Sequence, residues 1–300
     1  MKTILLTGKL GQLGWELQRT LLPLGRVVAV DQREVDLADA GALRRLLDEL
    51  RPDIIVNPAA YTAVDRAEQE PALAQAVNAL APAVLAEDAA RRGALLIHYS
   101  TDYVFDGAKP APYEEGDRTG PLGVYGRSKR EGEEAVLASG ADHLVFRTSW
   151  VYAARGANFL RTMLRLAGER EELRIVDDQV GAPTWARFLA EATALALRQA
   201  EAERRRGAFE SGLLHLTAAG KTSWHGFASA IVARAAQLPA APPLKVKTIR
   251  PIATAEYPLP TARPANSCLD TGKFRARFGL DIPAWEDCLQ LCLEELYGSY

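Results

Sequence analysis

With 300 residues, the chain is long enough to form one large domain or two, each with an ample buried core. Apolar residues make up 48% of it and charged residues 25%, which is ordinary for a globular protein of enzyme size. The 36 basic and 38 acidic residues leave a formal net charge of −2, so no strong field argues for nucleic acid or an anionic membrane as a partner.

Short apolar segments alternate with segments of helical spacing through the first half of the chain. The expected strands are 3–7, 27–30, 54–56, 94–99 and 144–148. The expected helices are 15–22, 42–50, 73–92 and 128–138. Continuous apolar strands separated by helices indicate a parallel sheet covered on both faces. Right-handed crossovers then predict a Rossmann-like, doubly wound α/β fold.

The second half has a less regular pattern. Helical spacing recurs at 158–167, 186–199, 224–238 and 284–296, and short strands are expected at 173–176 and 213–216. Proline-rich connections run through 239–243 and 257–264. We expect residues 1–150 to form a dinucleotide-binding domain. Residues 151–300 should mainly form a smaller mixed α/β domain for the substrate, with approximate borders that leave room for interleaving.

The start of the chain and its cysteines are typical of a cytoplasmic protein. The apolar run 3–7 is too short for a signal peptide, and no segment has the apolar length needed to span a bilayer. Three cysteines cannot make a disulfide framework. Cys288 and Cys292 lie four residues apart, but no second Cys or His pair with zinc spacing accompanies them. We expect a cytoplasmic protein without a membrane partner.

Three glycines, Gly8, Gly11 and Gly14, directly follow the first expected strand and open a helix. Glycine suits a tight turn that must approach a pyrophosphate, and the amides of a helix amino terminus attract the anion. The spacing is G-x-x-G-x-x-G rather than G-x-G-x-x-G. The motif predicts a dinucleotide site, and a glycine-rich turn without a ligand is the alternative.

Two residues near the end of the second expected strand bear on the choice of dinucleotide. Asp31 stands where an acid accepts hydrogen bonds from the adenosine ribose. Arg33 follows two residues later and can pair with a 2′-phosphate. Asp31 favours NADH and Arg33 admits NADPH, so both cofactors stay open.

Tyr125 and Lys129 stand four residues apart, on one face of an expected helix. A cation beside a phenol lowers the pKa of the phenol, which can then donate a proton to a carbonyl as hydride arrives. Thr101 follows the fourth expected strand, where a hydroxyl can polarise the carbonyl and bond to the tyrosine. A surface pair and a turn cap are the simpler alternatives, but the combination is more specific than any one element.

Together these motifs resemble the extended short-chain dehydrogenase/reductases and, more narrowly, the dTDP-4-dehydrorhamnose reductase family. The matching stretches are GKLGQLGWELQ (8–18), RPDIIVNPAAYTAVDRAE (51–68), HYSTDYVFDG (98–107), VYGRSKREGE (124–133), FRTSWVY (146–152), DDQVGAPT (177–184) and ARPANSCL (262–269). The resemblance implies reduction of the C4 keto group of dTDP-4-dehydro-6-deoxy-L-mannose to dTDP-L-rhamnose, a product used for cell-surface polysaccharide. It also implies hydride from NADPH or NADH and a proton from Tyr125.

By position, the resemblance implies a set of residues along the cofactor. The pyrophosphate would lie on the glycine loop, the adenosine ribose on Asp31, and the nicotinamide ribose on Lys129. The implied cofactor residues are Gly8, Gly11, Gln12, Leu13, Gly14, Asp31, Asp36, Leu37, Ala60, Tyr61, Thr62, Tyr99, Tyr125 and Lys129.

The resemblance also implies a nucleotide-sugar site. Thr101, Asp102 and Trp150 would face the sugar, and Thr101 would also tune Tyr125. Arg263 is a candidate for the diphosphate, because a guanidinium suits bidentate phosphate contact.

The resemblance leaves a metal and the oligomeric state open. Some members of the family hold Mg²⁺ between subunits through glutamates, and Glu16 lies in a matching stretch. Arg187 stands where a further acid would be wanted, with Glu191 one turn later, so we do not predict a metal. A homodimer is one expectation.

Two other functions stay open from the sequence. One is another nucleotide-sugar reductase or epimerase. The other is a non-catalytic subunit that binds dinucleotide, against which the intact Tyr125, Lys129 and Thr101 argue.

Overall fold

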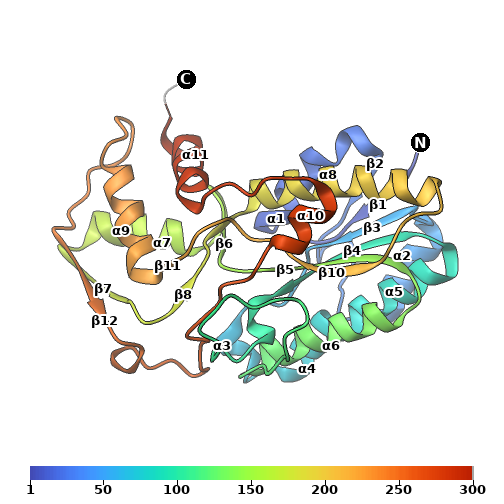
Figure 1. Ribbon diagram of the computed structural model, residues 1–300, viewed down its shortest axis with the longest axis horizontal. Coiled ribbons are helices and arrows are strands. Elements are labelled where there is room, and N and C mark those ends of the chain that lie inside the picture. Colours follow the sequence, from blue (N-terminus) through green and yellow to red (C-terminus); the bar gives the residue numbers. More distant parts are fainter. Residues whose placement is uncertain (299–300) are drawn as a thin grey trace.

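A parallel sheet of six strands forms the centre of the computed structural model, which describes residues 1–298 (Figure 1). Its strands are β1 (Thr3–Leu6), β2 (Arg26–Ala29), β3 (Ile54–Asn57), β4 (Leu95–Thr101), β5 (Asp142–Thr148) and β10 (Gly212–His215). They are ordered β10-β5-β4-β3-β1-β2, and every neighbouring pair is parallel. The predicted doubly wound α/β fold is confirmed, with the strand order reversing between β1 and β3.

Helices cover both faces of the sheet because successive strand residues point to opposite sides. Leu5 packs with α2 (Ala40–Leu50), α5 (Ala81–Arg92) and α6 (Val124–Ala138) in one buried cluster. Its neighbours Ile4 and Leu6 pack on the other face with α1 (Gln12–Thr20) and α8 (Ala186–Arg205). Figure 1 shows these two helical layers above and below the sheet.

The helix expected over 73–92 is broken in the structure. It consists of α4 (Pro71–Gln75), a π-helical turn (Ala76–Leu80) and α5. Pro82 has no N–H to donate to the Asn78 carbonyl, so the regular ladder cannot run through this turn. A short helix α3 (Val64–Ala67) precedes it.

Helix α6 begins at Val124, four residues earlier than expected. The amide of Val124 donates a hydrogen bond to Oε1 of Glu68 at 2.7 Å. The Glu68 side chain, from a distant segment, therefore accepts from an otherwise unpaired amide at the start of α6. The helix gains one turn, which carries Tyr125.

The second half builds a smaller layered unit beside the sheet, visible on the left of Figure 1. Its helices are α7 (Phe159–Glu169), α9 (Trp224–Ala235) and α11 (Trp285–Tyr297). Its strands are β6 (Val151–Tyr152), β7 (Glu172–Val176), β8 (Val180–Gly181), β9 (Thr184–Trp185), β11 (Thr222–Ser223) and β12 (Thr248–Ile252). Helix α10 (Gly272–Phe278) packs instead against β10 of the main sheet and against α8. Single 3₁₀ turns occur at Leu22–Leu24, Asp102–Val104 and Thr254–Glu256. Strand β12 and helix α10 lie outside the expected elements.

Part of the second half belongs to the main sheet. Strand β10 pairs with β5, and α8 packs along α1. The apolar core on that face continues from the sheet into α7, α9 and α11. The domain borders at residue 150 stay a prediction. None of the helices that the structure describes has both the length and the apolar character to cross a membrane.

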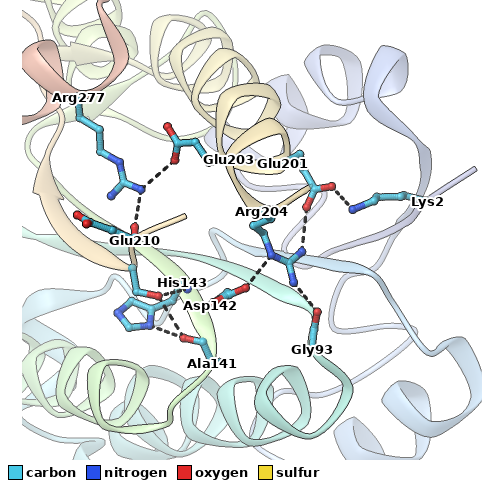
Figure 2. Close-up of polar contacts among 11 residues, drawn as sticks. Lys2, Gly93, Ala141, Asp142, His143, Glu201, Glu203, Arg204, Glu210 and Arg277 are labelled. Carbon is cyan, nitrogen blue, oxygen red and sulfur yellow. Dashed lines mark hydrogen bonds and ion pairs between the residues drawn. The ribbon is translucent and has the colours of Figure 1, made fainter. Parts of the chain in front are cut away.

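Arg204, near the end of α8, ties this helix to the amino-terminal edge of the sheet (Figure 2). Its Nε donates to Oδ2 of Asp142 at 2.8 Å, and its Nη1 donates to Oε1 of Glu201 at 2.9 Å. A third bond reaches the carbonyl of Gly93, and Glu201 also pairs with Lys2. One guanidinium thus joins α8 to the segments that start β4 and β5.

Replacing Arg204 with Ala should destabilise the fold. The side chain is 17% exposed, and its charge-assisted bonds should be worth about 1–2 kcal/mol, or a fall in Tm of about 2–6 °C. Arg205→Ala is the matched control, because Arg205 is exposed and should change Tm little. Equal melting temperatures for the two variants would contradict this role.

Candidate active site

A cavity of about 560 Å³ opens at the carboxyl ends of the strands, where the strand order reverses. Crevices at this place bind ligands in doubly wound folds. Every residue that the sequence suggested for the cofactor lines its wall. Other lining residues were not expected from the sequence, among them Thr7, Val30, Ala59, Thr148 and Val151. Most of these residues stand at or just after the carboxyl end of a strand, and this position in the sequence could have identified them.

The glycine loop requires glycine at two positions. Gly8 has φ +63°, and a Cβ on Gly14 would lie 2.0 Å from the Gly8 carbonyl oxygen. This contact lets α1 start directly against the end of β1. Gly11 is the N-cap of α1 and offers no side chain to its first amides. The amides at this end of α1 are therefore available to an anion in the cavity.

Charged side chains surround the far end of the cavity near β2. Oδ1 of Asp31 accepts a hydrogen bond from the Arg33 amide at 2.8 Å. Glu34 accepts one from the Asp31 amide at 2.9 Å and pairs with Lys9 at 2.5 Å. The hydrogen bond from Lys9 is the main reason that the pKa of Glu34 falls to about 2. Lys9 and Glu34 were not expected at this site.

Helix α6 brings Tyr125 and Lys129 into the cavity wall on successive turns. Both are buried, at 9% and 2% exposed. The ammonium of Lys129 donates a hydrogen bond to the Tyr99 carbonyl at 2.7 Å. Burial lowers the pKa of Lys129 to about 8, against the opposing effect of Glu133.

The phenol of Tyr125 is more strongly protonated than the sequence suggested. Burial raises the pKa of Tyr125 to about 12, and a hydrogen bond with Thr101 only partly offsets this. The prediction that Lys129 lowers this pKa is wrong here, because desolvation of the phenolate dominates. The neutral phenol that results is the form that can donate a proton.

A buried ion pair lies behind Lys129 and was not anticipated. Nε and Nη2 of Arg147 on β5 donate to the two carboxylate oxygens of Glu133 at 2.8 and 2.7 Å. Glu133 follows Tyr125 and Lys129 at four-residue spacing on α6, so the helical period was an available signal. The pair supports the second and third turns of α6 from the sheet.

Thr101 and Asp102 lie beside Tyr125 at the end of β4. The Thr101 hydroxyl donates to Oδ1 of Asp102 at 2.9 Å. Burial raises the pKa of Asp102 to about 6, although the hydrogen bond from Thr101 partly opposes the shift. Its Oδ2 has no hydrogen-bond partner within residues 1–298. This leaves a buried acceptor next to the phenol.

Arg263 reaches the same region from the proline-rich connection. Its guanidinium pairs with Asp65 at 2.8 Å and lies 6.0 Å from the ring of Tyr103. Tyr103 in turn packs edge-on against Tyr125, with 5.5 Å between ring centres. Trp150 follows β5, between the lining residues Thr148 and Val151. None of the four suggested substrate residues is among those that line the cavity. Thr101 and Asp102 lie beside Tyr125, and Arg263 reaches its neighbour Tyr103. Trp150 is placed near the cavity only by its neighbours in the chain.

Comparison with known proteins agrees with this architecture. A model of the family described as RmlD substrate binding domain matches residues 1–297. The dTDP-4-dehydrorhamnose reductase of Burkholderia thailandensis is 55% identical over 296 residues, which cover 99% of each chain. The enzyme of that name from Escherichia coli is 47% identical over 300 residues, covering 99% of this chain and 98% of that one.

The chain belongs to the RmlD family. The resemblance inferred from the motifs is confirmed. A solved dTDP-4-dehydrorhamnose reductase from Bacillus anthracis, in complex with NADP, superposes with a TM-score of 0.86. It is 34% identical, and the match covers 98% of this chain and 99% of that one.

The glutamates considered above as metal ligands, Glu16 and Glu191, lie close to the guanidinium of Arg187. Arg187 Nε donates to Oε2 of Glu16 at 3.2 Å, and its Nη2 donates to Oε1 of Glu295 at 2.9 Å. Its charge also acts on Glu191, whose pKa burial nevertheless raises. Among residues 1–298, no group of three or more His, Cys, Asp or Glu is arranged to hold a metal ion. A guanidinium already compensates these acids, so the residues present do not fit Mg²⁺.

Substituting Gly14 with Ala should damage the dinucleotide site. The added methyl group cannot fit 2.0 Å from a backbone oxygen, so either α1 or the Gly8 turn must move. We expect NADPH affinity to fall more than about tenfold, the equivalent of about 1.4 kcal/mol, in a fluorescence titration. Gly116→Ala is the control, because no atom lies within 4 Å of its Cβ position. Wild-type affinity in Gly14→Ala would show that the loop does not form the site.

Proposed function

We propose that this chain reduces the C4 keto group of dTDP-4-dehydro-6-deoxy-L-mannose with NADPH or NADH, giving dTDP-L-rhamnose. The observation that carries the proposal is one cavity lined by the glycine loop at one end and by Tyr125 and Lys129 at the other. The names of relatives at 55% and 47% identity over nearly the whole chain supply the substrate.

The glycine loop and the cavity wall fit an extended dinucleotide, which supplies a hydride when bound. The amides at the start of α1 would hold the pyrophosphate, since Gly11 leaves them uncapped. Asp31 would accept from the adenosine ribose hydroxyls. Arg33 is exposed beside it and could meet a 2′-phosphate, which supports use of both NADH and NADPH.

Tyr125 would supply the proton that neutralises the developing alkoxide at C4. Its raised pKa keeps it protonated at neutral pH, as a general acid requires. Thr101 lies beside the phenol at the end of β4 and would orient it. Lys129 would donate to the nicotinamide ribose from its position against the Tyr99 carbonyl.

The sugar nucleotide would bind against Thr101, Asp102 and Trp150, with Arg263 toward the diphosphate. The unpartnered Oδ2 of Asp102 supports this assignment, because a sugar hydroxyl could donate to it. Release of Arg263 from Asp65 would free a guanidinium for phosphate. We propose that residues after 150 mainly provide substrate binding, as Trp150 and Arg263 suggest.

The cytoplasm is the compartment we propose for this reaction. All three cysteines are buried and unpaired, which suits a reducing compartment. The homodimer stays a prediction.

Tyr125→Phe tests the reaction directly. Loss of the hydroxyl should lower kcat by about 10²–10⁴-fold and leave NADPH affinity nearly unchanged, because only the general acid is removed. The assay follows the absorbance of reduced nicotinamide with the keto sugar nucleotide as substrate. Tyr113→Phe removes a buried hydroxyl outside the cavity and serves as the control. A Tyr125→Phe enzyme with wild-type kcat, where chemistry limits turnover, would refute the mechanism.

The charge of Lys129 predicts a pH dependence of cofactor binding. Because burial lowers its pKa to about 8, the ammonium is lost as pH rises through that value, and NADPH affinity should weaken above it. Lys129→Met should bind weakly at every pH and lose this dependence. Lys247→Met, a change at a side chain that is 70% exposed, should behave as wild type. Titrations between pH 6.5 and 9.5 that show a flat wild-type profile would contradict the role of the charge.

A further inference from the structure

Trp150 has a backbone conformation that a bulky residue seldom adopts. Its φ is +49°, and Arg51 is the only other non-glycine residue within 1–298 with a positive φ. Arg51 ends helix α2, where a left-handed residue is common. Trp150 ends no helix. A strained bulky residue persists only where its surroundings hold it in place, and such residues gather at functional sites.

The surroundings of Trp150 hold it from three sides. Its indole stacks on Trp224, with 3.5 Å between ring centres and 7° between planes. Gly181 lies against the same indole, where a Cβ would come within 2.6 Å of Cε2. The Trp150 carbonyl accepts a hydrogen bond from the Thr184 amide at 3.2 Å. All three partners come from the second half of the chain.

Trp224 is itself held firmly. It is the first residue of α9, whose N-cap Ser223 accepts a hydrogen bond from the Gly226 amide at 2.9 Å. It also contacts Phe159 of α7, at 4.5 Å between ring centres, and Phe159 stacks on Phe227 in the core. The stack therefore connects the rim of the cavity to the apolar core of the second half.

We infer that Trp224 is a positioning residue for the nucleotide sugar: together with Gly181, it fixes the indole of Trp150 at the sugar end of the cavity. The inference rests on the proposed function, in which Trp150 faces the sugar. A stack of two indoles presents a large rigid surface at little cost in side-chain entropy. Without Trp224, the indole of Trp150 would lose its stacking partner, and only Gly181 and the Thr184 amide would still hold the residue.

The test compares binding of dTDP-L-rhamnose and of NADPH in four variants. Trp224→Leu should weaken dTDP-L-rhamnose binding, and raise KM for the keto sugar nucleotide, by about tenfold. Its kcat at saturation and its Kd for NADPH should stay near wild type. Trp224→Tyr keeps an aromatic stack and should restore most of the affinity. Gly181→Ala should mimic Trp224→Leu, because its methyl group displaces the indole while Trp224 is intact.

The control variant is Trp285→Leu. Trp285 is buried in the same aromatic cluster, where it packs edge-on against Phe227 at 5.9 Å. This change should lower Tm but leave sugar-nucleotide affinity unchanged. It therefore separates a general loss of packing from a loss of indole placement.

Circular dichroism gives a readout that does not depend on turnover. Two indoles stacked this closely should couple and give a paired positive and negative band. The paired band should vanish in Trp224→Leu and persist in Trp285→Leu. Addition of dTDP-L-rhamnose to the wild type should change it, and NADPH alone should not.

Two results would overturn the inference. If the wild type turns over but Trp224→Leu keeps its KM and its affinity for dTDP-L-rhamnose after the paired band is lost, the stack is only packing. If the wild type neither oxidises NADPH with the keto sugar nor binds dTDP-L-rhamnose, the proposed function fails and the inference falls with it.

Discussion

The close approach of Gly14 to the Gly8 carbonyl is the contact on which the arrangement of the site depends. It lets α1 begin directly at the end of β1, which places uncapped amides at the reversal in strand order. The segments at and after the ends of β2, β3, β4 and β5 and the first turns of α6 then supply most of the other walls of the cavity. A side chain at Gly14 would separate the helix from the strand and widen this edge.

Burial has opposite effects on the two ionisable groups of α6, and both follow from the cost of removing a charge from water. It raises the pKa of Tyr125 to about 12 and lowers that of Lys129 to about 8, which favours the neutral form of each group. The carboxylate of Glu133, which pairs with Arg147, counteracts only part of the lowering of the Lys129 pKa. The site therefore holds a proton on the phenol while keeping the ammonium close to its titration point.

Ion pairs and aromatic packing join the two halves of the chain at three separate places. Arg204 joins α8 to the amino-terminal edge of the sheet by ion pairs, and the Trp150–Trp224 stack joins the other edge to α9 by aromatic packing. Arg187 gathers Glu16 and Glu295 from α1 and α11 at a third place. There the positive charge of the Arg187 guanidinium, in place of a metal ion, balances the negative charge of the two carboxylates.

The sequence by itself determined the fold class and the residues of the proposed cofactor site, all of which line one cavity. Strand runs, the glycine spacing, Asp31 and the Tyr125–Lys129 pair are local patterns, and each is set by a backbone or helical period within a few residues. Resemblance over the whole chain supplied the substrate residues, including Asp102 and Arg263. These signals need no knowledge of which distant segments touch.

Only the tertiary structure decided the features that depend on such contacts. Glu68 starts α6 from a distant segment, and Pro82 breaks the helix before it. Desolvation of Tyr125 reverses the pKa shift that its neighbour on the helix suggested. The stack of Trp224 on Trp150 joins residues far apart in the chain. Burial and long-range contact carry no sequence period, so these properties became visible only once the chain was folded.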